Sequence, residues 1–77
     1  MREFNVAFRS FSDVQEFVRL VSEFTFDIFV SNDWQRVDAK SFMVMFSLDF
    51  SRQLRVLTQC DADEFAALKN AVSRFLV

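Results

Sequence analysis

The hydrophobic periodicity of this chain changes repeatedly, and these changes constrain the fold more than any other feature of the sequence. Phe4, Val6 and Phe8 alternate with polar or small residues, which is typical of a strand. After Ser12, apolar residues recur at helical spacing, and Gln15 is placed to complete a capping box. Along the whole chain the pattern predicts the order β-α-β-β-α-β-α, with strands at 3–8, 24–30, 34–39 and 54–60 and helices at 13–23, 42–48 and 61–77.

Three amphipathic helices and four half-apolar strands fit one arrangement. We predict an α+β open-faced β-sandwich, in which the helices cover one face of an antiparallel sheet. The 77 residues provide for a single domain, 1–77. A ferredoxin-like sensor domain has a related element order, so the pattern alone leaves that alternative open. The clearest apolar stripe lies on the final helix and consists of Phe65, Leu68, Val72, Phe75 and Leu76.

The composition excludes several classes of function. The net charge of -2, with no basic stripe, argues against nucleic acid as a direct partner. The chain has no Gly, Pro or His, which removes glycine-rich phosphate loops and every mechanism that needs an imidazole. Its single cysteine, Cys60, cannot form an internal disulfide or, without histidine, a zinc site. We expect no metal, no cofactor, no membrane partner and a cytoplasmic location.

The remaining polar and aromatic residues suggest structural roles. Trp34 is predicted to pack across the strands of a hairpin, and Cys60 to be a small hydrophobic residue at a strand end. Asp61, Asp63 and Glu64 stand where they would interact with the positive end of the final helix. No nucleophile, base and oxyanion site can be assembled from these residues, so we expect no enzymatic activity.

The stretch VDAKSFMVMFSLDF, residues 37–50, contains the longest apolar run. Ser41 precedes the run and is well placed to cap a short helix. If Met45 and Leu48 face the sheet, the other large side chains form an exposed contact surface, unless the Phe-rich core folds over them as well. The side chains left on or near the surface are Phe42, Met43 and Phe46.

The same stretch resembles a known family. Lys40-Ser41, an apolar residue, Met43, two more apolar residues and Phe46-Ser47-Leu48 resemble the regulatory-serine segment of HPr, the phosphocarrier protein of the bacterial sugar phosphotransferase system. Upstream, FVRLVSEFTFDIFVSN is similar to that family's first helix, second strand and turn, so the resemblance covers roughly residues 12–77. It implies an HPr-like fold for the whole chain.

The resemblance also implies a set of binding residues. Ser41 matches the family's regulatory serine, which a dedicated kinase phosphorylates in some bacteria, although it could equally serve only as a helix cap. The helix after it docks onto partner proteins in the HPr family. We therefore expect a protein partner to contact the start of the first helix and the second helix, and we leave homodimer formation open. The expected contact residues are Lys40, Phe42, Met43 and Phe46.

The start of the first helix departs from the family pattern. Active HPr proteins carry a phospho-accepting histidine there, in a Gly-x-His-x-Arg-Pro-type loop, whereas this chain reads FRSFSDV. Ser10 or Ser12 would lie near the corresponding place, but a hydroxyl does not replace a nucleophilic imidazole, and Asp13 would repel phosphate. We expect histidine phosphotransfer to be lost and the protein to act by binding, as the catabolite-repression paralogue of HPr does. The alternative is a small-molecule-sensing or structural dimerisation domain that shares only the fold.

Overall fold

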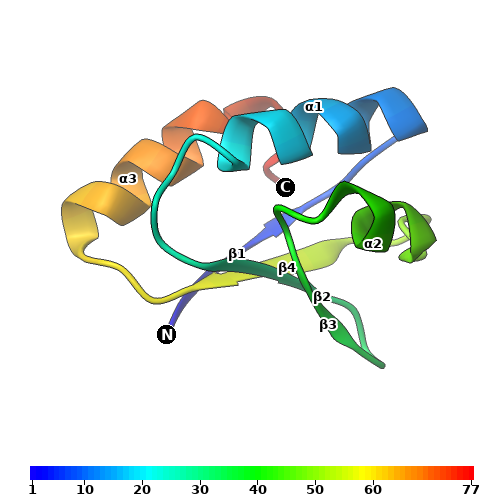
Figure 1. Cartoon of the computed structure of the whole chain (residues 1–77), viewed down its shortest axis with the longest axis horizontal. Coiled ribbons are helices and arrows are strands. Elements are labelled where there is room, and N and C mark those ends of the chain that lie inside the picture. The colour runs from blue at the N-terminus through cyan, green and yellow to red at the C-terminus, as the bar shows by residue number, and fades with distance from the viewer.

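The computed structural model describes residues 1–77 and contains one four-stranded antiparallel sheet (Figure 1). Val56 of the last strand lies opposite both Phe4 of the first strand and Val30 of the second. The first and last strands are therefore neighbours, and the order across the sheet is β1-β4-β2-β3. The strands are β1 (Arg2–Val6), β2 (Ile28–Ser31), β3 (Arg36–Asp38) and β4 (Leu54–Thr58).

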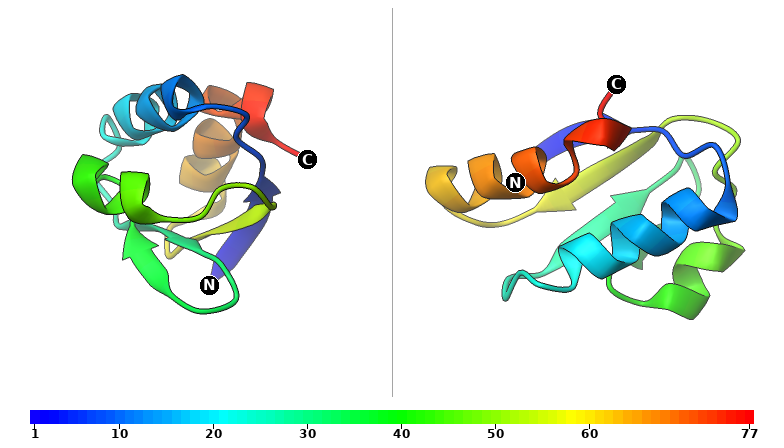
Figure 2. Two further views of the ribbon diagram at one scale, coloured as in Figure 1. Left: turned by 90° about the vertical axis from the view of Figure 1, so that its right-hand side faces the viewer. Right: turned by 90° about the horizontal axis from the view of Figure 1, so that it is seen from above.

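Three helices cover one face of this sheet, and α2 packs beside α1 (Figure 2). The opposite face is wetter, with exposed Asn5 and Arg55 and the half-buried pair Phe29 and Leu57. The predicted fold class and element order are therefore confirmed. The helices are α1 (Phe11–Val21), α2 (Phe42–Ser47) and α3 (Ala62–Ala71), and the short 3-10 helix η1 (Ser73–Phe75) follows α3.

The core lies between the inner face of the sheet and the helices. Phe8, Phe17 and Phe75 meet there, with ring centroids 5.0 to 6.0 Å apart in edge-to-face arrangements. These rings come from the segment before α1, from α1 and from η1, so they fix the start of α1 against the C-terminal end of the chain. The other buried apolar side chains include Val6, Val14, Val21, Ile28, Val30, Leu54, Val56 and Leu68.

The helix α1 begins earlier than the capping box predicts. Ser10, not Ser12, is the N-cap: its backbone is extended, with φ -157° and ψ 168°, and its hydroxyl accepts a hydrogen bond from the Asp13 amide at 3.3 Å. Ser12 instead lies inside the first turn, where its Oγ is 3.0 Å from that of Ser10. The predicted Ser12 and Gln15 capping box is therefore wrong.

The segment between α1 and β2 also differs from the prediction. Strand pairing begins only at Ile28, although Phe24 and Phe26 have the alternation of a strand. Their carbonyl oxygens accept hydrogen bonds from the Lys40 ammonium, at 2.6 and 2.8 Å, instead of joining the sheet. Both rings still pack against the core, 5.5 Å apart, so the alternation reflects burial without strand pairing.

The C-terminal helix is shorter than predicted. The acidic residues lie at the positive end of α3 as predicted, where Asp61 and Glu64 also form a reciprocal capping box, but α3 ends at Ala71. The chain then turns through η1 toward the sheet edge, where Leu76 forms a bridge with Val6. Of the predicted stripe, Leu68, Val72 and Phe75 are buried, whereas Phe65 and Leu76 are half-buried.

Candidate functional site at the start of α1 and on α2

The helix α2 is short, and it and its C-cap residue each turn one large side chain into the core. Met45 and Leu48 are buried, which confirms the predicted phase of the helix. Met43 is 81% exposed, and Phe42 and Val44 are each exposed to just under two fifths. A helix of six residues cannot hide every side, so α2 presents an apolar surface to solvent.

The start of α1 and the loop after α2 extend this apolar surface. Phe11, at the start of α1, is 59% exposed, and its ring centroid lies 5.3 Å from that of Phe46 and 5.1 Å from that of Phe50. Phe42 in turn lies 4.3 Å from Phe46. We call this set the aromatic patch, and it consists of Phe11, Phe42, Met43, Phe46 and Phe50.

The sequence did not single out Phe11 or Phe50. Both lie in stretches that the sequence assigns to turns, and neither belongs to an apolar periodicity. Only the residue type could have identified them from the sequence, since a phenylalanine in a polar turn is unusual and marks a ring that packs on another part of the chain. Figure 2 shows how the fold brings the start of α1 beside α2.

Ser41 occupies the N-cap position of α2 through its backbone only. Its carbonyl accepts a hydrogen bond from the Met45 amide at 2.9 Å, but its hydroxyl makes no capping hydrogen bond. The residue is half-buried. The Ser41 hydroxyl is therefore not committed to capping α2.

Lys40 does not stand free beside Ser41. Its Nζ donates to the carbonyl oxygens of Phe24 and Phe26, and its amide donates to the Asp38 carboxylate at 2.9 Å. The side chain is half-buried and joins the segment before β2 to the start of α2. Its charge is partly satisfied by two carbonyl dipoles before any partner arrives.

The start of α1 is closed by groups of the protein itself. One carboxylate oxygen of Asp13 accepts a hydrogen bond from the Arg9 amide at 2.9 Å, and the other pairs with the Arg74 guanidinium at 2.8 Å. The Asp13 side chain is only 17% exposed. A negative charge therefore already occupies the place where the positive end of the helix would attract an anion.

Two acidic groups near this surface have shifted pKa values, and both shifts are downward. The Arg19 guanidinium holds the pKa of the Glu16 carboxyl below its usual value, mainly through a direct hydrogen bond. The Ser51 amide, at 2.9 Å, lowers the pKa of Asp49. Both groups are ionised at neutral pH, and a lowered pKa is the opposite of what a general acid needs.

Trp34 and Cys60 lie outside this site. The expectation that Trp34 packs across the hairpin is wrong: the side chain lies in the β2–β3 turn and is 88% exposed. Cys60 is a half-buried free cysteine after β4, and its carbonyl accepts from the Arg2 guanidinium at 3.1 Å. No three acidic, cysteine or histidine side chains gather in a way that could hold a metal ion.

The four-stranded antiparallel sheet, in the order β1-β4-β2-β3 with three helices on one face, is the class of fold that the resemblance to HPr implies. A sequence model described as the "PTS HPr component phosphorylation site" matches residues 13–76. The chain therefore belongs to the HPr family, whose members are phosphocarriers that interact with other proteins rather than catalysts.

Solved structures agree with this assignment. HPr-C-His from Thermoanaerobacter tengcongensis is 24% identical, with a TM-score of 0.72 over 95% of this chain and 92% of that one. The phosphocarrier protein HPr from Bacillus anthracis is 22% identical, with a TM-score of 0.71 over 96% and 93%. Crh, the catabolite repression containing protein of Bacillus subtilis, is 22% identical, with a TM-score of 0.63 over 95% and 87%.

No curated protein sequence matches the chain significantly. Among the helices, none has both the length and the apolar character needed to cross a membrane.

Proposed function

We propose that this HPr-family protein is a non-catalytic regulatory protein that has lost histidine phosphotransfer and acts in the bacterial cytoplasm by binding another protein. The observation that carries the proposal is the start of α1. The chain has no histidine, and the Asp13 carboxylate already takes the Arg9 amide and the Arg74 guanidinium. An incoming phosphoryl group would find no imidazole to accept it, and it would meet the like charge of Asp13.

The aromatic patch supports protein binding as the activity that remains once phosphotransfer is lost. Phe11 and Met43 leave more than half of their surface in water, a cost that folding alone does not explain. Aromatic and methionine side chains suit adaptable protein contacts, because they supply large apolar areas in a choice of shapes. We assign the partner to this patch, with Lys40 at its edge.

Ser41 is the proposed point of control, with a serine kinase as a second partner. Its hydroxyl makes no capping hydrogen bond, and a phosphate there would add a charge of about -1.5 to -2 beside the first amides of α2. Because Lys40 is held by two carbonyls, it would neutralise this phosphate only by leaving them. The added charge would therefore act mainly on the partner, which it would attract or repel according to the partner's own charge.

Incubation with phosphoenolpyruvate and enzyme I tests the loss of phosphotransfer. We expect the intact mass of this protein to stay unchanged, while the Bacillus anthracis HPr, as the positive control, gains one acid-labile phosphoryl group. A Ser10→His variant distinguishes two reasons why phosphotransfer would fail, the lack of a histidine and the closed start of α1. If it also stays unlabelled, the closed start of α1 prevents the reaction, whereas labelling of the wild type would overturn the proposal.

Homodimer formation is a second candidate activity. Crh from Bacillus subtilis was solved as an intertwined dimer with a swapped domain. In this chain β1 lies at an edge of the sheet and pairs with one strand, β4, and through a single bridge with Leu76, so the same exchange is open to it topologically. Light scattering after size-exclusion chromatography, across a range of protein concentrations, would show a dimer mass if exchange occurs.

A further inference from the structure

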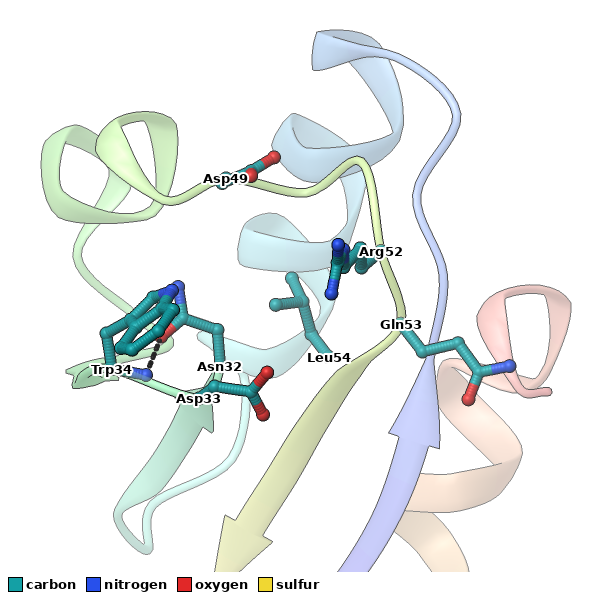
Figure 3. A pocket seen from close by; sticks show the side chains of 7 residues that line it. All are labelled: Asn32, Asp33, Trp34, Asp49, Arg52, Gln53 and Leu54. Atoms are coloured by element: carbon teal, nitrogen blue, oxygen red, sulfur yellow. Dashed lines mark hydrogen bonds between the residues drawn. The ribbon is translucent and has the colours of Figure 1, made fainter.

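A shallow hollow lies between the β2–β3 turn and the loop that enters β4. It has two adjoining parts of about 210 and 370 Å³, which share Asn32, Asp33, Gln53 and Leu54. Trp34 stands at its rim, and Figure 3 shows the indole on one side of Leu54 and Arg52 on the other, with the Asp33 carboxylate between them. The larger part is in the range of small-ligand sites.

The indole of Trp34 is held in water by a rigid turn. The Asn32 side-chain oxygen accepts from the amides of both Trp34 and Gln35 at 2.8 Å, and the Asn32 amide donates to the Gln35 carbonyl at 3.1 Å. A fully buried indole would remove 150 Å² or more of surface from water, roughly, yet 88% of this side chain is exposed. The exposed indole contributes little to folding, and the hydrogen-bonded turn fixes the backbone that carries it, which reduces the entropy cost of binding.

Three polar groups of the hollow are not used by the fold, whereas Asp49 accepts a hydrogen bond from the Ser51 amide and Arg55 lies 3.9 Å from Glu3. The Asp33 carboxylate and the Arg52 guanidinium form no ion pair, and the Asn32 side-chain NH2 is free because only its oxygen is engaged. These groups offer one charged acceptor and two kinds of donor around the indole face. On the far side, Gln53 and Asn5 add two further amides.

The chemistry of this lining selects one class of ligand. The charges of the lining balance, with Asp33 and Asp49 against Arg52 and Arg55, so the hollow favours neither an anion nor a cation, and no cluster of metal ligands is present. Only Trp34 and Leu54 are hydrophobic, which disfavours a fully apolar molecule. The lining therefore suits a neutral molecule with one apolar face and many hydrogen-bonding groups. A sugar ring is such a molecule, because one face of the ring carries C–H groups that stack on an indole while its hydroxyls both donate and accept hydrogen bonds.

We propose that the hollow beside Trp34 is a binding site for a neutral saccharide of one or two rings, with the indole as the stacking platform. Asp33 accepts hydrogen bonds from ring hydroxyls, and Arg52 and the Asn32 side-chain NH2 donate to them. The site is open on one side, so the affinity is modest. For a ligand of about a dozen non-hydrogen atoms we expect a dissociation constant of roughly 1–10 mM.

Intrinsic fluorescence tests the proposal directly, because Trp34 is the only tryptophan and the chain has no tyrosine. The wild-type protein is titrated with glucose, galactose, N-acetylglucosamine and maltose, and free N-acetyltryptophanamide serves as the blank. We expect at least one sugar to give a saturable change. In heteronuclear NMR spectra the same sugar should shift the amides of 32–35 and 52–54, and those of α2 should stay in place.

Matched variants complete the test. Asp33→Ala and Arg52→Ala should each weaken binding about tenfold, since each removes a hydrogen bond to or from a charged group. Glu23→Ala and Lys69→Ala, exposed charges on other parts of the surface, should leave it unchanged. Trp34→Ala, followed by NMR, should abolish the shifts without unfolding the protein. The proposal is overturned if no sugar saturates the signal, if inorganic phosphate or adenosine binds in preference, or if the Glu23 and Asp33 variants behave alike.

Discussion

Removing the Asp13 carboxylate is the most direct test of how the start of α1 is closed. Asp13→Ala deletes the hydrogen bond from the Arg9 amide and the ion pair with Arg74. A hydrogen bond to a charged acceptor stabilises a fold by about 1.5–3 kcal/mol, and an ion pair whose arginine is 61% exposed adds at most about 1 kcal/mol. We expect a loss of about 2 kcal/mol, which in a domain of this size lowers the melting temperature by roughly 8–16 °C.

The assay is urea unfolding at pH 7, followed by circular dichroism, together with a double-mutant cycle. Arg74→Ala alone should cost less than Asp13→Ala, and the coupling between the two should be roughly 0.2–1 kcal/mol. Ser12→Ala, an exposed neighbour in the same turn, is the control and should stay within about 0.5 kcal/mol of the wild type. If Asp13→Ala behaves like this control, the carboxylate does not close the helix, and the argument against phosphate binding there loses its basis.

Four further predictions concern the core, the patch and acid stability. Leu68→Ala should destabilise the protein by about 2–5 kcal/mol in the same unfolding assay, because Leu68 is fully buried; a change under about 0.5 kcal/mol would contradict that. Met43→Asp should leave stability near wild type but abolish capture of the partner in a pull-down, and unchanged capture would remove the patch from the interface. Ser41→Asp should keep its circular dichroism spectrum while altering the proteins captured, and an identical set would argue against control at this position. The lowered pKa of Asp49 gives stability that is fully present at neutral pH and is lost as acid protonates the carboxylate, so NMR titration should place its midpoint below that of the same residue in an unfolded peptide.

The features that the sequence predicts well are those set by burial. The alternation and helical spacing of apolar residues report which side faces the core, so the element order, the inward turn of Met45 and Leu48 and the buried centre of the C-terminal stripe follow from pattern alone. Strand ends are less certain: β1 ends at Val6 instead of residue 8, and β4 at Thr58 instead of residue 60. Pairing at the ends depends on neighbours that the pattern does not describe.

The features that the sequence misses depend on contacts between distant segments. Ser10 and Ser12 offer the same hydroxyl, and only the backbone conformation decides which one caps α1. Lys40 looks like a surface cation until the fold places two carbonyls, more than a dozen residues away, within its reach. Phe11 becomes part of the aromatic patch only because α2 lies beside it. The composition of the candidate site was therefore only partly predictable.

The bridge between Val6 and Leu76, together with the hydrogen bond from the Val77 amide to the Asn5 carbonyl, has a consequence for biosynthesis. The strand β1 is synthesised well before both of its partners, β4 and residues 76–77. This part of the sheet therefore cannot close until those segments have been made, and until then β1 is an unpaired strand. During this interval the backbone N–H and C=O groups of β1 are open to pairing with other chains, which the completed sheet prevents on the side of β4.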